Sequence, residues 1–399
     1  MFEPTHRTAA RRAGRRRVAA VAALTALALP ALSACEGAPE TAASSPAPDS
    51  SASPVPAALA PEPGTAAAIT AALEATLATD TLTATYGLDL PALGRRTLLN
   101  QMPPADRAMA RKLLQGRDFS DEITIHTRDG NVGDLLATLV ADIRDPDSPG
   151  FTHATLDALA DVDLRMRPGG VENPLLDLIL VDGVLHLATS TDLLTALAGG
   201  PVDRSEFAGT VLAGPAYTLL DGGYLSLDLT EADLDGVIQR LSPDPTSARA
   251  AGKQLRVAAE AFEVLTAAAA DHAEIVEAGD GWLTVTLTSD QQFYDAVIAL
   301  ARSRGYGDLI DAVGQEPANL TTTVQVRIED QLLTGARFDL TQLDLPLPFD
   351  GPASVWIELT PDADAPSAPL DPFDITDLFN LAQPRVDELA DTDADLTST

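Results

Sequence analysis

Apolar and polar residues alternate along several stretches in the middle of the chain. Between Val162 and Met166, for example, Asp163 and Arg165 separate the apolar positions. A period of two with one polar face is typical of antiparallel strands whose sheet is covered on one side only. Each such stretch predicts a strand of this kind. The alternating sets are Ile123/Ile125, Val162/Leu164/Met166, Leu225/Leu227/Leu229, Leu283/Val285/Leu287, Val324/Val326/Ile328 and Val355/Ile357/Leu359.

Short turn sequences separate some of these stretches. Asp182-Gly183 lies inside LLDLILVDGVLHLA and predicts a two-residue hairpin, because both central positions of the favoured turn need positive φ. Gly279-Asp280-Gly281 and Glu329-Asp330 predict two further hairpin turns. The strands are therefore expected to pair mainly with their antiparallel neighbours.

Other stretches repeat apolar residues at steps of three and four, which predicts amphipathic helices. The longest is expected over Gly252–His272, and Thr230 is expected to cap another. Ser289 and Gln292 form a capping-box pattern before a third helix, which Gly305 ends. Shorter helices are expected over 105–115, 191–198 and 375–381.

These elements predict an α+β fold rather than a doubly wound one, because no regular strand–helix–strand rhythm runs through the chain. We expect a large antiparallel sheet with helices packed on its apolar face. The sequence leaves open whether this body is one domain or two abutting halves that divide near Ser242–Gly252, where Pro, Ser and Ala cluster.

The first 34 residues have the order of a secretory signal peptide. Six arginines between positions 7 and 17 stand against one acid, Glu3, and an apolar stretch from Val18 to Ala31 follows. Spanning a bilayer needs about 20 residues, so this stretch suits a signal better than a transmembrane anchor.

The stretch ends in Leu32-Ser33-Ala34-Cys35, which resembles the bacterial lipobox. The resemblance implies that the Cys35 thiol receives a diacylglyceryl group and that the chain is cut just before it. Cys35 is the only cysteine of the chain, and it stands at this one position. Each buried CH₂ of an acyl chain contributes about 0.8 kcal/mol, so two or more chains would hold the protein firmly at the outer face of the cell membrane.

Composition divides the remaining chain into three parts. Residues 35–64 hold the lipidated cysteine and a Pro/Ala/Ser-rich stretch without aromatic or basic residues, which predicts a disordered tether. If it were fully extended in polyproline form, it would reach roughly 90 Å. Residues 65–385 carry the periodic patterns and form the predicted α+β body, and residues 386–399 read as an acidic disordered tail.

The charge balance limits the classes of partner. The chain has 26 Lys and Arg against 59 Asp and Glu, a formal net charge of −33. Binding nucleic acid through phosphate neutralisation needs a basic face, so nucleic acid is excluded as a partner of that kind. A basic protein partner suits the acidic surface better. One cysteine also excludes a disulfide framework, a Cys-based zinc site and an iron–sulfur cluster.

Familiar catalytic motifs are absent from the sequence. It contains no S-x-x-K with a usable lysine, no G-x-S-x-G elbow, no Walker loop and no H-E-x-x-H. We therefore expect neither an enzyme nor a cofactor or metal site. Four histidines follow the signal, and His126 and His186 fall on the polar faces of predicted strands. A hydrolase with a Ser–His pair stays open as a third class, although no residue pattern nominates its serine.

Two local phrases add a family resemblance. VDGVLHLA is followed by the short helical stretch TDLLTAL, and GGYLSLDLTEADLDGVI comes next. Together with the lipobox, the tether and the one-sided sheet, this order resembles the LppX/LprG-type lipoproteins of mycobacteria and their relatives, which are similar to the LolA/LolB half-barrel. The resemblance covers part of the body and implies a lipid carrier. It carries over no individual residue.

The resulting hypothesis is an envelope lipoprotein that binds or shuttles a lipid or other hydrophobic ligand. A curved sheet leaves apolar side chains facing a gap, and acyl chains can fill what the helices do not. The alternative is a non-enzymatic envelope interaction protein in which the same residues form a filled core. The expected lining residues are Ile125, Leu164, Met166, Leu178, Leu227, Val285 and Val326 on strands, and Phe262, Leu265, Phe293 and Val297 on helices.

Overall fold

The fold is taken from a computed structural model of the chain. It describes residues 65–101, 119–144, 162–170, 172–231, 267–307, 320–342 and 350–382, with shorter pieces at 257, 260–261, 263–265 and 309–310. The predicted signal peptide, Cys35, the tether, Phe262 and the acidic tail lie outside the described residues, as do the helices expected after Thr230 and over 105–115.

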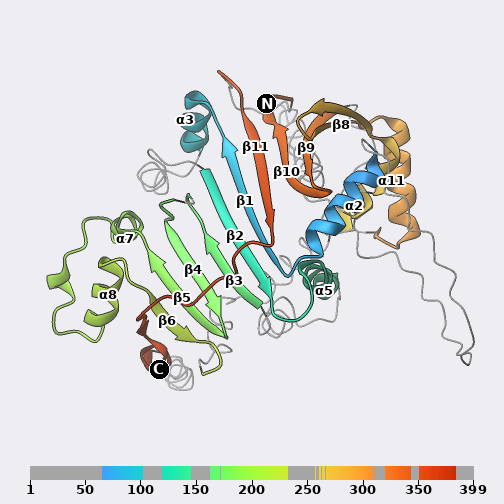
Figure 1. The fold of residues 1–399 in the computed structure, drawn as a ribbon. Coiled ribbons are helices and arrows are strands. Elements are labelled where there is room, and N and C mark those ends of the chain that lie inside the picture. The colour runs from blue at the N-terminus through green and yellow to red at the C-terminus, as the bar shows by residue number, and fades with distance from the viewer. Residues whose placement is uncertain are drawn as a thin grey trace, which may run out of the picture.

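Twelve strands form one open sheet (Figure 1). Its order is β12-β6-β5-β4-β3-β2-β1-β11-β10-β9-β8-β7, and every neighbouring pair is antiparallel except β12–β6. The strands are β1 (Thr81–Asp89), β2 (Phe119–Thr127), β3 (Val162–Arg167), β4 (Leu176–Val181), β5 (Val184–Thr189), β6 (Leu225–Asp228), β7 (Glu274–Gly279), β8 (Trp282–Thr288), β9 (Thr321–Glu329), β10 (Leu332–Asp339), β11 (Ser354–Pro361) and β12 (Phe373–Asp374).

Helices flank this sheet at separate places. Among the described elements, α2 packs on β10, α5 on β2, α8 on β6 and β12, and α13 on β6. The helices are α2 (Ala66–Leu77), α3 (Ala92–Gln101), α5 (Val132–Arg144), α7 (Thr191–Leu197), α8 (Ala213–Leu220), α11 (Gln291–Ser303) and α13 (Thr376–Ala382), with short 3₁₀ turns η2 (Arg204–Glu206) and η3 (Leu340–Gln342). The predicted α+β class, with a large and mostly antiparallel sheet and helices, is confirmed. The sheet is open and uncurled, which differs from the half-barrel that the family resemblance implies.

The hairpin turns follow the predicted chemistry with one shift. Asp182 and Gly183 both adopt positive φ between β4 and β5, as a tight two-residue turn requires. The turn between β9 and β10 lies one residue later than predicted, at Asp330 and Gln331, and both of these residues adopt positive φ. Glu329 instead ends β9, opposite Leu332.

Helix α11 begins one residue later than its capping-box pattern suggests. The carboxylate of Asp290 accepts a hydrogen bond from the Phe293 N–H at 2.9 Å, which makes Asp290 the N-cap. The Ser289 hydroxyl is engaged elsewhere, because it donates to the Leu320 carbonyl and accepts from the Leu320 N–H. The expected C-terminal glycine is correct: Gly305 follows the C-cap residue Arg304 with φ +78°.

A dense core lies between α2 and the β8–β11 part of the sheet. Leu73 and Leu77 of α2 are almost fully buried there, and inward side chains of β8, β9 and β10 surround them. A second cluster forms where α11 packs with residues from the 261–269 region. The first cluster comprises Ala72, Leu73, Leu77, Leu82, Leu90, Val132, Leu283, Val285, Val324, Val326, Leu333, Ala336, Phe338, Leu340 and Ala353.

The segment from β11 to β12 crosses the sheet. Seven inter-strand spacings separate β11 from β12, which is about 34 Å at roughly 4.8 Å per spacing. The residues from Pro361 to Phe373 can extend about 40 Å at roughly 3.3 Å per step, so this segment must be nearly straight. Figure 1 shows it passing in front of β3, β4 and β5 before it reaches β6. We call residues 362–372 the strap.

Candidate functional site

Two rows of apolar side chains run across one face of the sheet from β1 to β6. Strand register places Ile125 opposite Leu164 and Met166 opposite Leu178, and the same pairing continues to both sides. Because side chains alternate along each strand, all of these residues share one face. The rows are Leu82, Ile125, Leu164, Leu180, Leu185, Leu227 and Ala84, Ile123, Met166, Leu178, Leu187, Leu225.

This apolar face is covered differently at its two ends. Over β8–β11, which we call the closed half, α2 seals it, and Val324, Val326 and Phe338 are almost fully buried. Over β2–β6, which we call the open half, most residues of the rows are only partly buried, including Leu164 and Leu178. No described helix packs extensively on β3, β4 or β5. The open half therefore presents a partly exposed apolar surface.

Five of the expected lining residues lie together in these rows: Ile125, Leu164, Met166, Leu178 and Leu227. All five belong to the open half and are partly buried, and Ile125 also packs against the first core cluster. The sequence pattern alone thus brought together residues from four strands that the fold places on one surface.

Five other expected lining residues lie elsewhere. They were expected to line a cavity between strands and helices, and this expectation is wrong for them because they pack into the two core clusters. Val285 and Val326 are packed into the core under α2. Phe293 and Val297 of α11 belong to the second cluster, which Leu265 also contacts. These five side chains fill closed packing and do not roof the open half, so we leave them out of the candidate surface.

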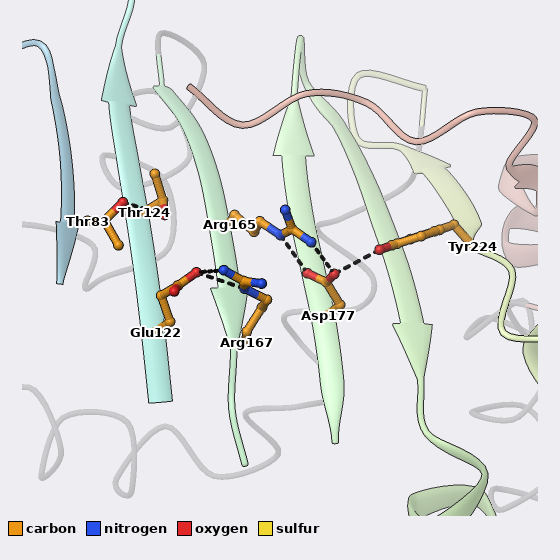
Figure 2. Close-up of polar contacts among 7 residues, drawn as sticks. All are labelled: Thr83, Glu122, Thr124, Arg165, Arg167, Asp177 and Tyr224. Carbon is orange, nitrogen blue, oxygen red and sulfur yellow. Dashed lines mark hydrogen bonds and ion pairs between the residues drawn. The ribbon is translucent and has the colours of Figure 1, made fainter. Parts of the chain in front are cut away.

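The opposite, polar face of β2–β4 is held by ion pairs (Figure 2). The guanidinium of Arg167 on β3 donates to Glu122 on β2, with Nε 2.7 Å from Oε1. Arg165 donates two hydrogen bonds to Asp177 on β4 in a bidentate pair, with Nε 3.1 Å from Oδ1 and Nη2 2.7 Å from Oδ2. The hydroxyl of Tyr224 donates to the same Asp177 Oδ2 at 2.8 Å. Glu122 and Asp177 are both buried, whereas Arg165 and Arg167 stay partly exposed, so these bonds link three strands on a partly buried face of the sheet.

Burial and these bonds change the proton affinity of several groups. The pKa of the Tyr224 hydroxyl is raised, first by burial and then by its hydrogen bond to Asp177. The pKa of Arg165 is raised mainly by its hydrogen bond to Asp177. Both groups therefore stay protonated at neutral pH. Each can then donate hydrogen bonds to the Asp177 carboxylate, which keeps the network intact.

The two histidines on the polar face have different surroundings. His126 and His186 both lie on this face, as predicted, and His126 Nδ1 contacts the Thr81 hydroxyl at 2.8 Å. His186 is buried opposite Ser226, but its Nδ1 has no hydrogen-bond partner. Burial lowers the pKa of His186, so the ring is neutral at pH 7.

A small apolar pocket lies beyond the end of the sheet. Residues 190–224, which we call the lobe, contain α7, η2 and α8 and connect β5 to β6. Figure 1 shows the lobe projecting past β5 and β6. The lobe forms an open-sided pocket of about 250 Å³ lined by Leu194, Val202, Phe207, Leu212, Pro215, Ala216, Leu219 and Leu220. Sequence reasoning missed this pocket, although the run from Phe207 to Leu220 without any charge was a signal for it.

In the part of the chain that the structure describes, no helix combines the length and the apolar character needed to cross a bilayer. Those residues also bring together no group of three or more His, Cys, Asp or Glu side chains that could hold a metal ion. Compared with known proteins, the chain matches no protein-family model and no curated protein.

Proposed function

We propose that the protein is a membrane-anchored envelope lipoprotein that carries a lipid or another hydrophobic ligand on the apolar face of its open half. The observation that carries this proposal is the pair of apolar rows on β2–β6, which stay partly exposed while the same face is sealed over β8–β11. In this proposal Cys35 anchors the chain at the membrane through acyl chains, as the lipobox resemblance implies. The proposed role is carriage, not catalysis.

The partly exposed apolar rows of the open half favour binding of a ligand on energetic grounds. Removing apolar surface from water contributes about 25 cal/mol per Å², so each partly exposed leucine leaves part of this free energy unused. A hydrocarbon chain laid along Ile125, Leu164 and Leu227 would recover it without any change in the strands. Single exposed leucines are ordinary in proteins, but a contiguous apolar patch commonly marks an interaction site.

The polar face supports the same proposal, because it explains how an open apolar face can remain ordered. Cross-strand ion pairs such as Arg167–Glu122 and Arg165–Asp177 hold β2, β3 and β4 in register from the opposite side. Hydrogen bonds between charged groups contribute more than neutral ones, about 1.5–3 kcal/mol each. The strands therefore depend less on packing of the apolar rows, which are left available to a ligand.

Binding is tested by native mass spectrometry of the chain purified from its host under gentle extraction. We expect a co-purifying lipid or hydrophobic molecule on the wild type and its loss from the double variant Met166→Gln, Leu178→Gln, whose amides place polar groups in the middle of the open half. The variant Val276→Gln is the matched control, because Val276 is an exposed apolar residue on β7, at the other edge of the sheet.

The outcomes separate carriage from a filled core. A wild type that carries no ligand after gentle extraction, and gains none when incubated with lipid vesicles, would contradict the proposal and favour the interaction protein. Equal ligand content in the double variant and the control would show that the ligand binds elsewhere. Circular dichroism of each variant checks that the sheet is retained.

A further inference from the structure

The large apolar side chains that the protein exposes gather at one end of the molecule. Most of those in the described residues lie in the lobe or in the segment around β12 that α8 contacts. Val211 and Leu197 expose 79% and 67% of their surface, and Leu370, just before β12, exposes 95%. Among the described residues, the set is Tyr86, Leu93, Leu197, Val211, Leu212, Val276, Leu370 and Phe373. One exposed residue of this kind is ordinary, but the concentration of several at one end points to a contact surface.

The lobe and β12 form a single unit. Helix α8 packs on both β6 and β12. Gly214 of α8 lies so close to Phe373 that an added Cβ would stand 2.6 Å from the ring, so Phe373 packs directly on the helix. The exposed Phe373 therefore lies against the lobe and next to β6, where the open half ends.

The distribution of charge on the lobe favours an uncharged partner surface over an anionic one. The lobe holds four acids and one basic residue, Arg204, and the run between Glu206 and Asp221 has no charge at all. Arg204 is already paired with Asp221 and lies over the Tyr217 ring. With four acids against one paired cation, the lobe is not attracted to anionic headgroups through charge. An apolar tip without a basic rim suits the interface of a bilayer of zwitterionic lipids.

We propose that the lobe inserts Leu197, Val211 and Leu212 into a zwitterionic lipid bilayer and that hydrophobic ligand passes there between the membrane and the open half. The proposal rests on the function proposed above and names the partner of that site. Three features support it: the exposed apolar tip, the apolar pocket of about 250 Å³ behind it, to which Leu212 also contributes, and the contact of α8 with β6, where the apolar rows end. A tether of the length expected for residues 35–64 would let the lobe reach the membrane that anchors it.

The test measures binding to vesicles of pure phosphatidylcholine by sedimentation. The protein is the chain from position 35 onward with Cys35→Ser, which keeps every described residue and removes the acylation site. We compare it with the double variant Leu197→Asp, Val211→Asp, which changes exposed tip residues outside the pocket lining, and with the control Val276→Asp on β7. Burying one Val or Leu side chain is worth about a tenfold change in partition, so the double variant should bind at least tenfold more weakly and the control like the wild type.

Each result decides the matter. Equal vesicle binding by the double variant and the wild type would overturn the proposal, as would a wild type that does not bind these vesicles. A wild-type dimer that the double variant converts to a monomer, without vesicle binding, would assign the tip to a second copy of the chain instead. Ligand content measured on the same samples separates the two proposals, because the double variant should still hold its ligand but exchange it more slowly with vesicles.

Discussion

The hydroxyl of Thr76 forms hydrogen bonds that connect α2 to β10 of the sheet. Removing it should lower the free energy of unfolding by an amount that can be calculated. Thr76 is fully buried. Its Oγ1 accepts a hydrogen bond from the Leu333 N–H at 2.8 Å and donates toward the carbonyls of Ala72 at 2.9 Å and Leu333 at 3.2 Å. The register of β10 against β9 shifts between Leu333 and Gly335, and at this irregularity the Thr76 hydroxyl serves as the partner of the Leu333 N–H.

Replacing Thr76 by valine keeps the shape and the helix propensity but removes this hydroxyl. The buried N–H of Leu333 then has no partner, and an unsatisfied buried donor costs about 1–3 kcal/mol. We expect Thr76→Val to lower the free energy of unfolding by about 2 kcal/mol. Urea denaturation followed by circular dichroism measures this change as a lower midpoint at unchanged slope.

The same helix offers a matched control. The hydroxyl of Thr70 also bonds the carbonyl four residues earlier, but Thr70 is exposed, so Thr70→Val should change stability by less than about 0.5 kcal/mol. Thr76→Ser keeps the hydroxyl and should cost less than Thr76→Val. If Thr76→Val behaves like Thr70→Val, the hydroxyl does not fasten α2 to β10, and the sealing of the closed half needs another explanation.

Three further changes test other parts of the structure. Asp177→Asn should lower the free energy of unfolding by about 2 kcal/mol, because the buried carboxylate that accepts both hydrogen bonds from Arg165 loses its charge. Urea unfolding of this variant at the wild-type midpoint would show that the ion pairs do not stabilise the open half. Burial lowers the pKa of His186 in the folded protein. As the pH falls below about 6.5, the ring is protonated in the unfolded chain before it is protonated in the folded one, so the free energy of unfolding should decrease there. His186→Gln should lose less stability than the wild type between pH 7.5 and pH 5.5, and equal losses would argue against a buried neutral ring. Gly87→Ala would place a Cβ 2.4 Å from the Trp356 ring and should cost about 1–3 kcal/mol by thermal or urea unfolding, whereas Gly200→Ala has open space and should be neutral.

Strands could be predicted where alternation was regular. The patterns around Leu164, Val285 and Val326 each fall within a strand, because one face of the sheet is apolar along its whole width. In β10 the irregularity after Leu333 breaks the alternation, so no clean period of two was available there. Strand β1 carries the same signal as its neighbours, in Leu82, Ala84, Tyr86 and Leu88, and could have been found by it.

The helix that seals the closed half gave almost no sequence signal. Helix α2 reads AAAITAALEATL, in which alanine stands on every side, so apolar and polar faces hardly differ. Its N-cap Thr65, whose hydroxyl accepts from the Ala68 N–H, was the one clear local mark. Alanine-rich helices of this kind are placed by tertiary packing, which a single sequence does not contain.

This explains why the lining residues could be predicted only in part. Met166 and Val326 sit in equivalent alternating patterns, yet one is partly exposed and the other is buried under α2. The pattern tells which face a residue occupies, whereas its cover depends on an element distant in the chain. The exposed tip of the lobe was missed for a similar reason, since exposure of Val211 and Leu197 depends on how the lobe projects from the sheet.

Photo-crosslinking with a diazirine-labelled fatty acid tests most directly where a hydrophobic ligand sits. After illumination and digestion, mass spectrometry locates the adducts on the chain. We expect them on peptides that contain Leu164, Met166 and Leu178 of the open half, competed away by unlabelled lipid. Adducts confined to peptides of the closed half around Val285 and Val326, or no competed adducts at all, would contradict a ligand-binding role for the open half.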